Sequence, residues 1–215
     1  MLVTKIEDYA KKRYQIWLDG EAAFVLYKGD LRRYGIREGE ELDETAYELI
    51  QKEVLSKRAE KRALHLLEKR DYTAAGLRRK LTDGGYSEEI AEAAVEAMKS
   101  YRYLDDARYA DQYIRCYAGR KTRRWISAKL AEKGIAKDVI ANVYESFDEE
   151  GIEADEEKMA VELLKKRHYE GGPLEKKEMD RHIAFLMRRG FSVSCIRKAI
   201  AALRSGYDEG YDDTF

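Results

Sequence analysis

One pattern of apolar residues and glycine occurs three times in this chain of 215 residues. The segments LRRKLTDGGYSEEI, ISAKLAEKGIAKDV and HIAFLMRRGFSVSC align with their glycines in register, at Gly85, Gly134 and Gly190. Each glycine lies four residues after a leucine and directly before an apolar residue. This spacing is typical of the Schellman motif, in which a glycine in the left-handed conformation ends a helix. The residue after the glycine then contacts the residue four positions before the glycine, here the leucine. The pattern therefore predicts three helix C-caps of one kind, at these glycines.

Each predicted helix end belongs to a longer repeated unit. A predicted helix precedes each of the three segments. A further predicted helix follows each glycine, with apolar residues at the same distances from the glycine in all three copies. The glycines are roughly 50 residues apart, a period typical of tandem α-helical repeats whose neighbours complete one another's cores. The sequence thus predicts a mostly α fold with three tandem three-helix modules in an elongated, curved array. We expect these modules at residues 44–103, 104–150 and 151–206.

The first 43 residues have a different texture. The stretch RYQIWLDGEAAFVLY contains two β-favouring runs separated by Asp19-Gly20, which is a type I′ hairpin signal. MLVTKIE can add a third strand, and we expect strand structure up to about Leu31. From Glu44 onward apolar residues recur at helical spacing. The prediction is a small N-terminal β-hairpin or sheet over residues 1–43, with an acidic, flexible tail at residues 207–215.

Composition limits the classes of partner. Lys and Arg number 41 against 42 Asp and Glu, so attraction to nucleic acid or anionic lipid must come from local patches. No stretch approaches the roughly 18 apolar residues of a membrane span, and MLVTKIEDYAKKR lacks the apolar core that a signal peptide needs, so we expect the protein to stay where it is made. Cys116 and Cys195 form no close pair, which fits a reducing compartment. We expect a cytoplasmic monomer, with Cys195 as a small core residue because it takes a repeat position held elsewhere by Ile90 and Val139.

No catalytic or cofactor signature is found in the sequence. The three histidines are far apart, and no phosphate loop or G-x-S-x-G motif is present. We therefore predict no enzyme activity, no cofactor and no metal.

Two adjacent aspartates in YLDDARYA resemble a polymerase metal box. Such a box needs a β-hairpin to present its carboxylates to two metals, but both flanks here are helical. Asp105 fits a helix N-cap, and Asp106 fits a favourable charge in the first turn. The alternative is a carboxylate-metal enzyme, in which Asp105→Asn would abolish activity without loss of stability. We favour a structural role for the motif residues, which are Tyr103, Leu104, Asp105, Asp106, Tyr109 and Ala110.

The segment GRKTRRWISAKLAEKG is strongly basic and contains a tryptophan. Such a segment can follow a phosphate backbone and stack on a base. Lysines on helices are also commonly solvated, and Trp125 can be half-buried beside Ile126, so both interpretations stay open. LRRK, at Leu77 to Lys80, and Arg188 with Arg189 occupy related helices, so a basic stripe can extend across the modules. The candidate partner-binding residues are Arg78, Arg79, Arg120, Lys121, Arg123, Arg124, Trp125 and Lys129.

The motif YLDDARYA is preceded by ALHLLEKRDYTAAGLRRKLTDGGYSEEIAEAAV and followed by RRWISAKLAEKGIAKDVI. This order of segments resembles the RecX family of recombination regulators, over about Arg58 to Leu203. The resemblance implies a non-enzymatic protein that binds along the groove of the RecA recombinase filament on single-stranded DNA. It implies restraint of ATP hydrolysis, strand exchange and co-protease activity, and some direct contact with DNA.

Without the resemblance, spacing and composition predict only a helical-repeat adaptor. A DNA-binding protein that uses its helix-Gly-helix units as helix-turn-helix readers is a further alternative, and it predicts tight, salt-sensitive binding to naked DNA. The acidic tail can compete with the basic segment for a partner. Deleting Tyr207 to Phe215 should then tighten binding at low salt.

Overall fold

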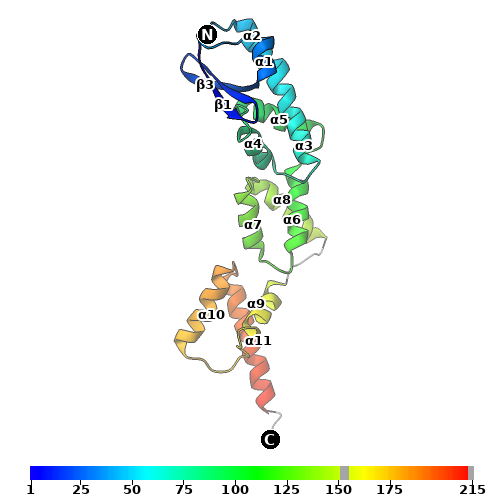
Figure 1. Ribbon diagram of the computed structural model, residues 1–215. Helices are drawn as coiled ribbons and strands as arrows, with labels where there is room; N and C mark the ends of the chain where they lie inside the picture. The colour runs from blue at the N-terminus through cyan, green and yellow to red at the C-terminus, as the bar shows by residue number, and fades with distance from the viewer. Residues whose placement is uncertain (151–154, 213–215) are drawn as a thin grey trace. The chain divides into compact units, whose positions relative to one another are not determined.

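The computed structural model describes residues 1–150 and 155–212, with side chains described up to Tyr207. The chain divides into two compact units, Met1–Asp106 and Ala107–Phe215. Figure 1 traces the order of the elements along the chain, and each unit is described by itself below. No helix in the described ranges is both long and apolar enough to cross a membrane.

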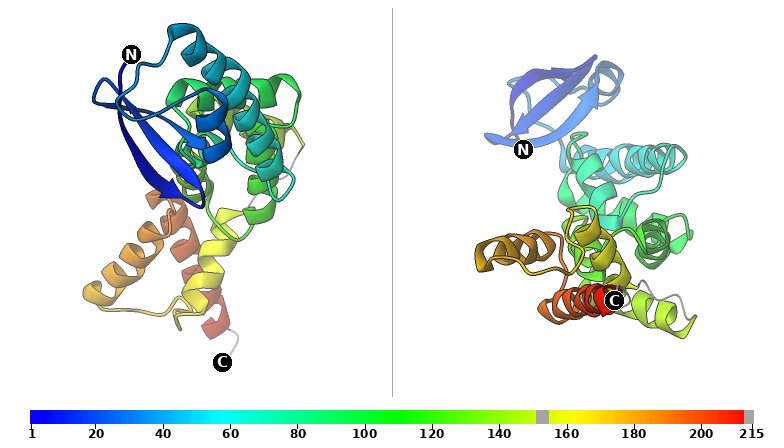
Figure 2. Two further views of the ribbon diagram at one scale, coloured as in Figure 1. Left: turned by 45° about the horizontal axis from the view of Figure 1, so that its top comes forward. Right: turned by 90° about the horizontal axis from the view of Figure 1, so that it is seen from below.

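The first unit begins with a three-stranded antiparallel sheet in the order β1 (Val3–Ala10), β2 (Arg13–Leu18) and β3 (Glu21–Tyr27). Asp19 and Gly20, which join β2 to β3, have φ of 50° and 89°. Two successive positive φ values are the requirement of a type I′ turn, so the predicted hairpin is confirmed. The third strand is confirmed as well, and the strands lie side by side in Figures 1 and 2.

Strand structure ends earlier than expected, because α1 (Lys28–Arg33) begins directly after β3. The carboxylate of Asp30 accepts a hydrogen bond from the backbone N–H of Tyr27 at 3.0 Å and so satisfies a donor at the start of this helix. The prediction of strand up to about Leu31 is therefore wrong for its last four residues. Local side-chain capping outweighs the β-favouring composition here.

A continuous helical stretch follows, made of α2 (Glu44–Leu49), η1 (Ile50–Ser56) and α3 (Lys57–Leu67). The middle segment is a π-helix, whose wider turn places Ile50, Val54 and Leu55 in the core. The predicted change to helix at Glu44 is confirmed. The π-helical winding itself has no signal in the apolar spacing.

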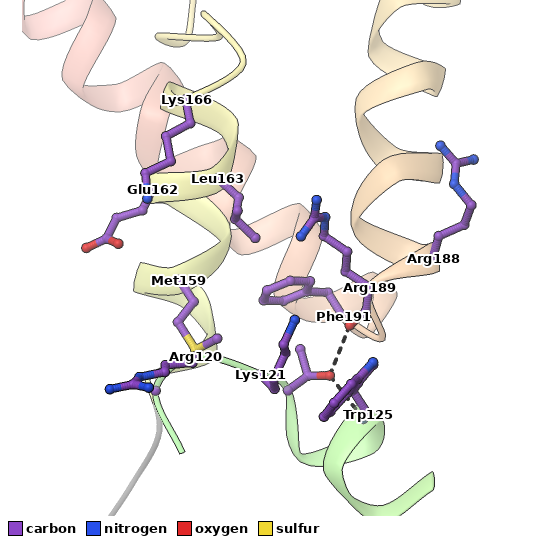
Figure 3. A pocket seen from close by; sticks show the side chains of 12 residues that line it. Arg120, Lys121, Trp125, Met159, Glu162, Leu163, Lys166, Arg188, Arg189 and Phe191 are labelled. Atoms are coloured by element: carbon purple, nitrogen blue, oxygen red, sulfur yellow. Dashed lines mark hydrogen bonds between the residues drawn. The ribbon is translucent and has the colours of Figure 1, made fainter. Parts of the chain in front are cut away.

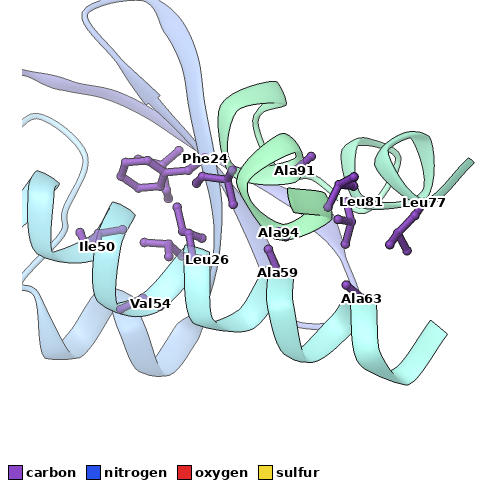
Figure 4. Close-up of a cluster of buried hydrophobic side chains, with 14 of the residues drawn as sticks. Phe24, Leu26, Ile50, Val54, Ala59, Ala63, Leu77, Leu81, Ala91 and Ala94 are labelled. Atoms are coloured by element: carbon purple, nitrogen blue, oxygen red, sulfur yellow. The ribbon is translucent and has the colours of Figure 1, made fainter. Parts of the chain in front are cut away.

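The first three-helix module consists of α3, α4 (Ala74–Thr82) and α5 (Glu88–Ser100). Small residues on α3 and α5 allow the two helices to approach closely, and Figure 4 shows these alanines beside the leucines of α4. Strand residues complete the same core, with Leu26 fully buried and Phe24 4% exposed. The buried alanines are Ala59, Ala63, Ala91 and Ala94.

The end of α4 packs against the sheet. The Arg13 guanidinium donates to the Gly84 carbonyl at 2.8 Å, and the Tyr9 hydroxyl donates to the Asp83 carbonyl at 3.3 Å. A Cβ at Gly85 would lie 2.7 Å from a methyl carbon of Val25, so this position has no space for a side chain. The glycine therefore allows the sheet and the module to meet.

The second unit contains two further three-helix modules, with separate buried clusters. In Figures 1 and 2, α9 and α11 lie side by side, and α10 meets α11 at one corner. Cys195 is 7% exposed in the core of the last module, which confirms the prediction of a small core residue. The helices of the two modules are α6 (Asp106–Tyr117), α7 (Arg123–Glu132), α8 (Lys137–Glu149), α9 (Glu156–Lys165), α10 (Lys176–Arg188) and α11 (Val193–Asp212).

The three repeated glycines end their helices in one way. Gly85, Gly134 and Gly190 have φ of 92°, 86° and 95°. The N–H of each following residue donates to the carbonyl of the repeated leucine, at 3.3, 3.1 and 3.2 Å. The N–H of each glycine donates to the carbonyl three residues earlier, at 2.9, 2.9 and 3.0 Å. This is the pair of hydrogen bonds that defines the Schellman motif.

The C-terminal segment differs from the expected flexible tail. The backbone of α11 continues as a helix to Asp212. The side chains from Asp208 onward and residues 213–215 lie outside the described residues, so the predicted competition of the acidic side chains with the basic segment stays a hypothesis.

Candidate partner-binding surface

A buried threonine joins the two modules of the second unit. Thr122 is 1% exposed and is the N-cap of α7, where its hydroxyl accepts a hydrogen bond from the Trp125 N–H at 3.2 Å. The same hydroxyl donates to the carbonyl of Arg189, at the end of α10, at 3.2 Å. A Cβ at Gly190 would lie 2.5 Å from this oxygen. The start of α7 and the end of α10 therefore meet at one hydroxyl group, without space for a side chain at position 190.

A pocket of about 360 Å³ lies beside this joint. Figure 3 shows that its walls come from the start of α7, from α9 and from the end of α10. Its apolar lining consists of Trp125, Met159, Leu163 and Phe191. Its charged lining consists of Arg120, Lys121, Glu162, Lys166, Arg188 and Arg189.

The cationic side chains of the pocket differ from the other basic residues of this unit. None of the five has a carboxylate within salt-bridge distance among the described residues. By contrast, Lys129 pairs with Glu132 at 2.6 Å, and Arg115 pairs with both Asp111 and Glu150. The pocket therefore has an excess of positive charge that no described carboxylate neutralises through an ion pair, and such a site attracts anions.

Trp125 lies at the edge of the pocket with its ring already in contact with other groups. The Lys121 ammonium lies 4.9 Å from the centre of the ring, and the Lys129 ammonium lies 5.9 Å from it. The Tyr117 ring lies 5.7 Å from it, as the last of a row that includes Tyr109 and Tyr113. Cation–π contacts and ring packing therefore hold the half-buried indole in place.

Three of the sequence-predicted residues line the pocket: Arg120, Lys121 and Trp125. Arg124 is exposed on α7 but is not part of the lining. Arg78 and Arg79 belong to the first unit, where Arg78 forms an ion pair with Glu92 at 2.8 Å.

Arg123 has a different role from its neighbours. Its guanidinium forms a two-pronged ion pair with Asp148 at 3.0 to 3.1 Å and lies 4.1 Å from the centre of the Tyr144 ring. Its backbone N–H donates to Glu156 at 2.7 Å. These contacts tie α7 to α8 and α9. Arg123 and Lys129 therefore differ from the cations of the pocket, because both pair with carboxylates of the protein, and their predicted role in partner binding stays a prediction.

Sequence reasoning missed half of the pocket. Met159 and Leu163 come from α9 and Lys166 follows it directly, and they reach the site only because the last module packs on the one before it. Arg188 and Arg189 had one sequence signal, their position just before the repeated glycine at the end of a helix. Basic residues are common at helix ends, so this signal alone does not indicate a site.

The aspartates of YLDDARYA lie where α4 and α6 begin. Asp106 accepts a hydrogen bond from the backbone N–H of Ala74, the first residue of α4, at 2.8 Å. Asp105 directly precedes α6. Leu104 and Ala110 are buried, with exposed fractions of 3% and 0%. The described part of the chain contains no group of three potential metal-binding side chains. Asp106 thus lies in the first turn of α6, and its carboxylate also satisfies a backbone N–H at the start of α4, a structural contact that the sequence did not predict.

Comparison with known proteins finds matches over most of the chain. Three family models match it in order, the first, second and third three-helix domains of RecX, at residues 59–97, 105–143 and 155–200. The chain is 31% identical over 202 residues to the regulatory protein RecX of Caldanaerobacter subterraneus subsp. tengcongensis, across 93% of this chain and 98% of that protein. This chain belongs to the RecX family. The resemblance recognised in the sequence is therefore confirmed.

Other RecX proteins agree with this assignment. The regulatory protein RecX of Clostridium perfringens (strain SM101 / Type A) is 28% identical over 207 residues, across 94% of this chain and 91% of that protein. A crystal structure of a regulatory protein RecX superposes with a TM-score of 0.58 at 28% identity, over 91% of this chain and 97% of that one. RecX from Lactobacillus salivarius shares the fold, with a TM-score of 0.57 at 18% identity over 69% of this chain and 96% of that one. The predicted fold class, with its three tandem three-helix modules and small N-terminal sheet, is confirmed.

Proposed function

We propose that this chain is a non-enzymatic regulator that binds the RecA recombinase filament on single-stranded DNA along its groove. In this proposal it inhibits ATP hydrolysis, strand exchange and co-protease activity, and it acts as a cytoplasmic monomer without a cofactor. Membership of a family whose relatives are named regulatory proteins supports this proposal. The observation that carries it is the pocket of the second unit, where five cationic side chains have no carboxylate partner among the described residues.

Inhibition would be mechanical. The hydrogen bond between Thr122 and Arg189 fixes two modules to each other, and the pocket lies beside that joint. If these two modules contact neighbouring recombinase protomers, they resist the motions of one protomer against the next that accompany ATP hydrolysis. Occupation of the groove also obstructs an incoming duplex or a co-protease substrate. No bond is made or broken by this chain in either step.

Filament binding can be tested with a charge-reversal pair. Arg120→Glu combined with Arg188→Glu reverses two exposed cations of the pocket, and both side chains lack ion pairs within the described residues. Lys177→Glu combined with Arg181→Glu makes the same charge change on exposed residues of α10 outside the pocket. Co-sedimentation with recombinase on single-stranded DNA should weaken for the first pair alone. Equal binding by both pairs would remove the pocket from the proposed interface.

Direct DNA binding is a second candidate function, because the same five cations could contact phosphates. If all five did so, the logarithm of the binding constant for duplex DNA should fall with the logarithm of salt concentration with a slope of about −4 to −5. A series of salt concentrations with naked DNA measures this slope directly. Tight binding with that slope, in the absence of recombinase, would favour this candidate over the filament.

A further inference from the structure

We infer that the pocket of the second unit binds an acidic peptide segment that inserts an apolar anchor side chain. This inference rests on the proposed function, since it uses the same surface and gives the chemistry of the partner segment. Both the charge of the pocket and its lining favour such a segment. The rim attracts acid groups, the floor is apolar, and the aromatic rings offer little space for a nucleic acid base.

The rim of the pocket is complementary to acidic side chains. Five cationic side chains line it against a single carboxylate, that of Glu162. Four of the cationic side chains are exposed to solvent: Arg120, Lys166, Arg188 and Arg189. Long exposed cations around a concave site steer acidic ligands to it and favour them over basic ones. Figure 3 shows Arg120 and Lys166 beside α9, and Arg188 and Arg189 at the end of α10.

The floor of the pocket suits an apolar side chain. Met159 and Leu163 lie one helical turn apart on α9 and line the pocket, and Phe191 lines it with an exposed fraction of 3%. The volume of about 360 Å³ is at the lower end of the range for ligand pockets. A small pocket that combines an apolar wall with charged residues around it can take one apolar anchor side chain from a peptide. Methionine adapts its shape to such an anchor.

Stacking of a nucleic acid base is the weaker alternative. Sequence-independent binding of single strands relies on aromatic faces on which bases stack. The Trp125 ring already has Lys121 at 4.9 Å and Tyr117 at 5.7 Å, so a base would have to displace one of them. Phe191 is too deeply buried to offer a face. The remaining apolar lining is aliphatic, from Met159 and Leu163, and favours a side chain over a base.

The test uses three probes with the full-length chain at near-physiological salt. The first is a short fluorescein-labelled peptide in which a Leu-Phe pair is flanked on both sides by aspartates. The second has Ser-Ser in place of Leu-Phe, and the third is a labelled oligothymidylate of equal net charge. Fluorescence anisotropy should show the Leu-Phe peptide binding about tenfold more tightly than the Ser-Ser peptide, and more tightly than the oligothymidylate. Because the anchor is varied in the probe, this comparison does not depend on a variant that folds.

Protein variants then locate the binding. The combination of Arg120→Glu and Arg188→Glu should abolish binding of the Leu-Phe peptide, and the matched combination of Lys177→Glu and Arg181→Glu should retain it. Equal affinity for the two peptides, or tighter binding of the oligothymidylate, would overturn the inference. If the peptide does not bind while recombinase ATP hydrolysis is still inhibited, the inference fails and the proposed function stands. If the peptide binds but hydrolysis is unaffected, the proposed function fails.

Discussion

Gly190 combines two requirements at a single residue. Its φ of 95° lies in the left-handed region, where a side chain is strained. The absence of a Cβ also leaves space for the hydroxyl of Thr122, 2.5 Å from where that atom would be. Gly119 has only the first requirement, with φ of 73° and open space around its Cα. A comparison of substitutions at Gly119 and Gly190 therefore distinguishes the effect of backbone strain from the effect of close packing.

Substitution of Gly190 by alanine should destabilise the chain more than substitution of Gly119. We expect Gly119→Ala to lower the free energy of unfolding by about 1 kcal/mol from strain alone. Gly190→Ala should lower it by about 2 to 4 kcal/mol, because overpacking against Thr122 is added. Urea unfolding followed by circular dichroism measures both values. Equal losses would show that the contact with Thr122 is not tight.

The two cysteines should differ in reactivity. Burial, with the carboxylates of Glu156 and Glu157 nearby, raises the pKa of the Cys195 thiol to about 11. At pH 8 about one thiol in a thousand would then be the reactive thiolate. Cys116 is exposed on α6. Iodoacetamide labelling of the native chain, followed by mass spectrometry, should modify Cys116 rapidly and Cys195 only after unfolding. Similar rates at both residues would contradict the burial of Cys195.

At the scale of elements, one ion pair connects the end of the sheet to the first module. Asp30 on α1 accepts two hydrogen bonds from the Arg58 guanidinium on α3, at 2.5 and 2.8 Å. Burial alone would raise the pKa of Asp30. The hydrogen bonds from Arg58 and from the Tyr27 N–H outweigh burial, so this pKa lies below its ordinary value. The charged form is therefore favoured by folding.

Arg58→Met should lower the free energy of unfolding by about 1 to 3 kcal/mol at pH 7, because it leaves the carboxylate of Asp30 without its main partner. A lowered pKa stabilises the folded state above the ordinary Asp pKa of about 4, and this contribution is lost as pH falls through the folded value. The difference in the free energy of unfolding between wild type and variant should therefore shrink as the pH is lowered from 7 to 3. Urea unfolding at several pH values measures it. A difference that stays constant or grows on acidification would contradict this account.

The repeated elements were predictable from sequence because their signals are local. Each Schellman end lies within a few residues of its leucine, and the hairpin turn depends on two adjacent residues, Asp19 and Gly20. The π-helical segment and the pair of Asp30 with Arg58 depend on packing between distant residues. The first left no trace in the apolar spacing, and the second joins positions 28 residues apart. Such contacts cannot be inferred from one sequence without the fold.

At the scale of the whole molecule, the candidate site was predictable only in part. The basic segment around Trp125 indicated the right region because its charge is contiguous in sequence. Sequence gave no sign that Asp148 neutralises Arg123, or that Lys166 and Met159 come to the same pocket from α9. The first depends on how α7 packs on α8 within one module, and the second on how the last module meets the one before it. A surface that lies between modules therefore needs the structure.

The difference between Arg123 and its neighbours gives a prediction for the whole protein. Charge reversal at Arg120, Lys121 and Arg124 together should weaken inhibition of recombinase ATP hydrolysis by about tenfold or more, with an unchanged circular dichroism spectrum. Adding Arg123→Glu should also lower the melting temperature, because it breaks the ion pair with Asp148 and the contact with Tyr144. Full inhibition by the triple variant would remove this face from the interface.

The central claim is that this member of the RecX family restrains a recombinase filament, and one titration tests it most directly. Recombinase is assembled on single-stranded DNA, the purified chain is added stepwise at near-physiological salt, and the rate of ATP hydrolysis is followed. The account predicts a saturable fall in rate at well below one regulator per recombinase protomer. An unchanged rate up to a molar excess of the regulator would contradict it.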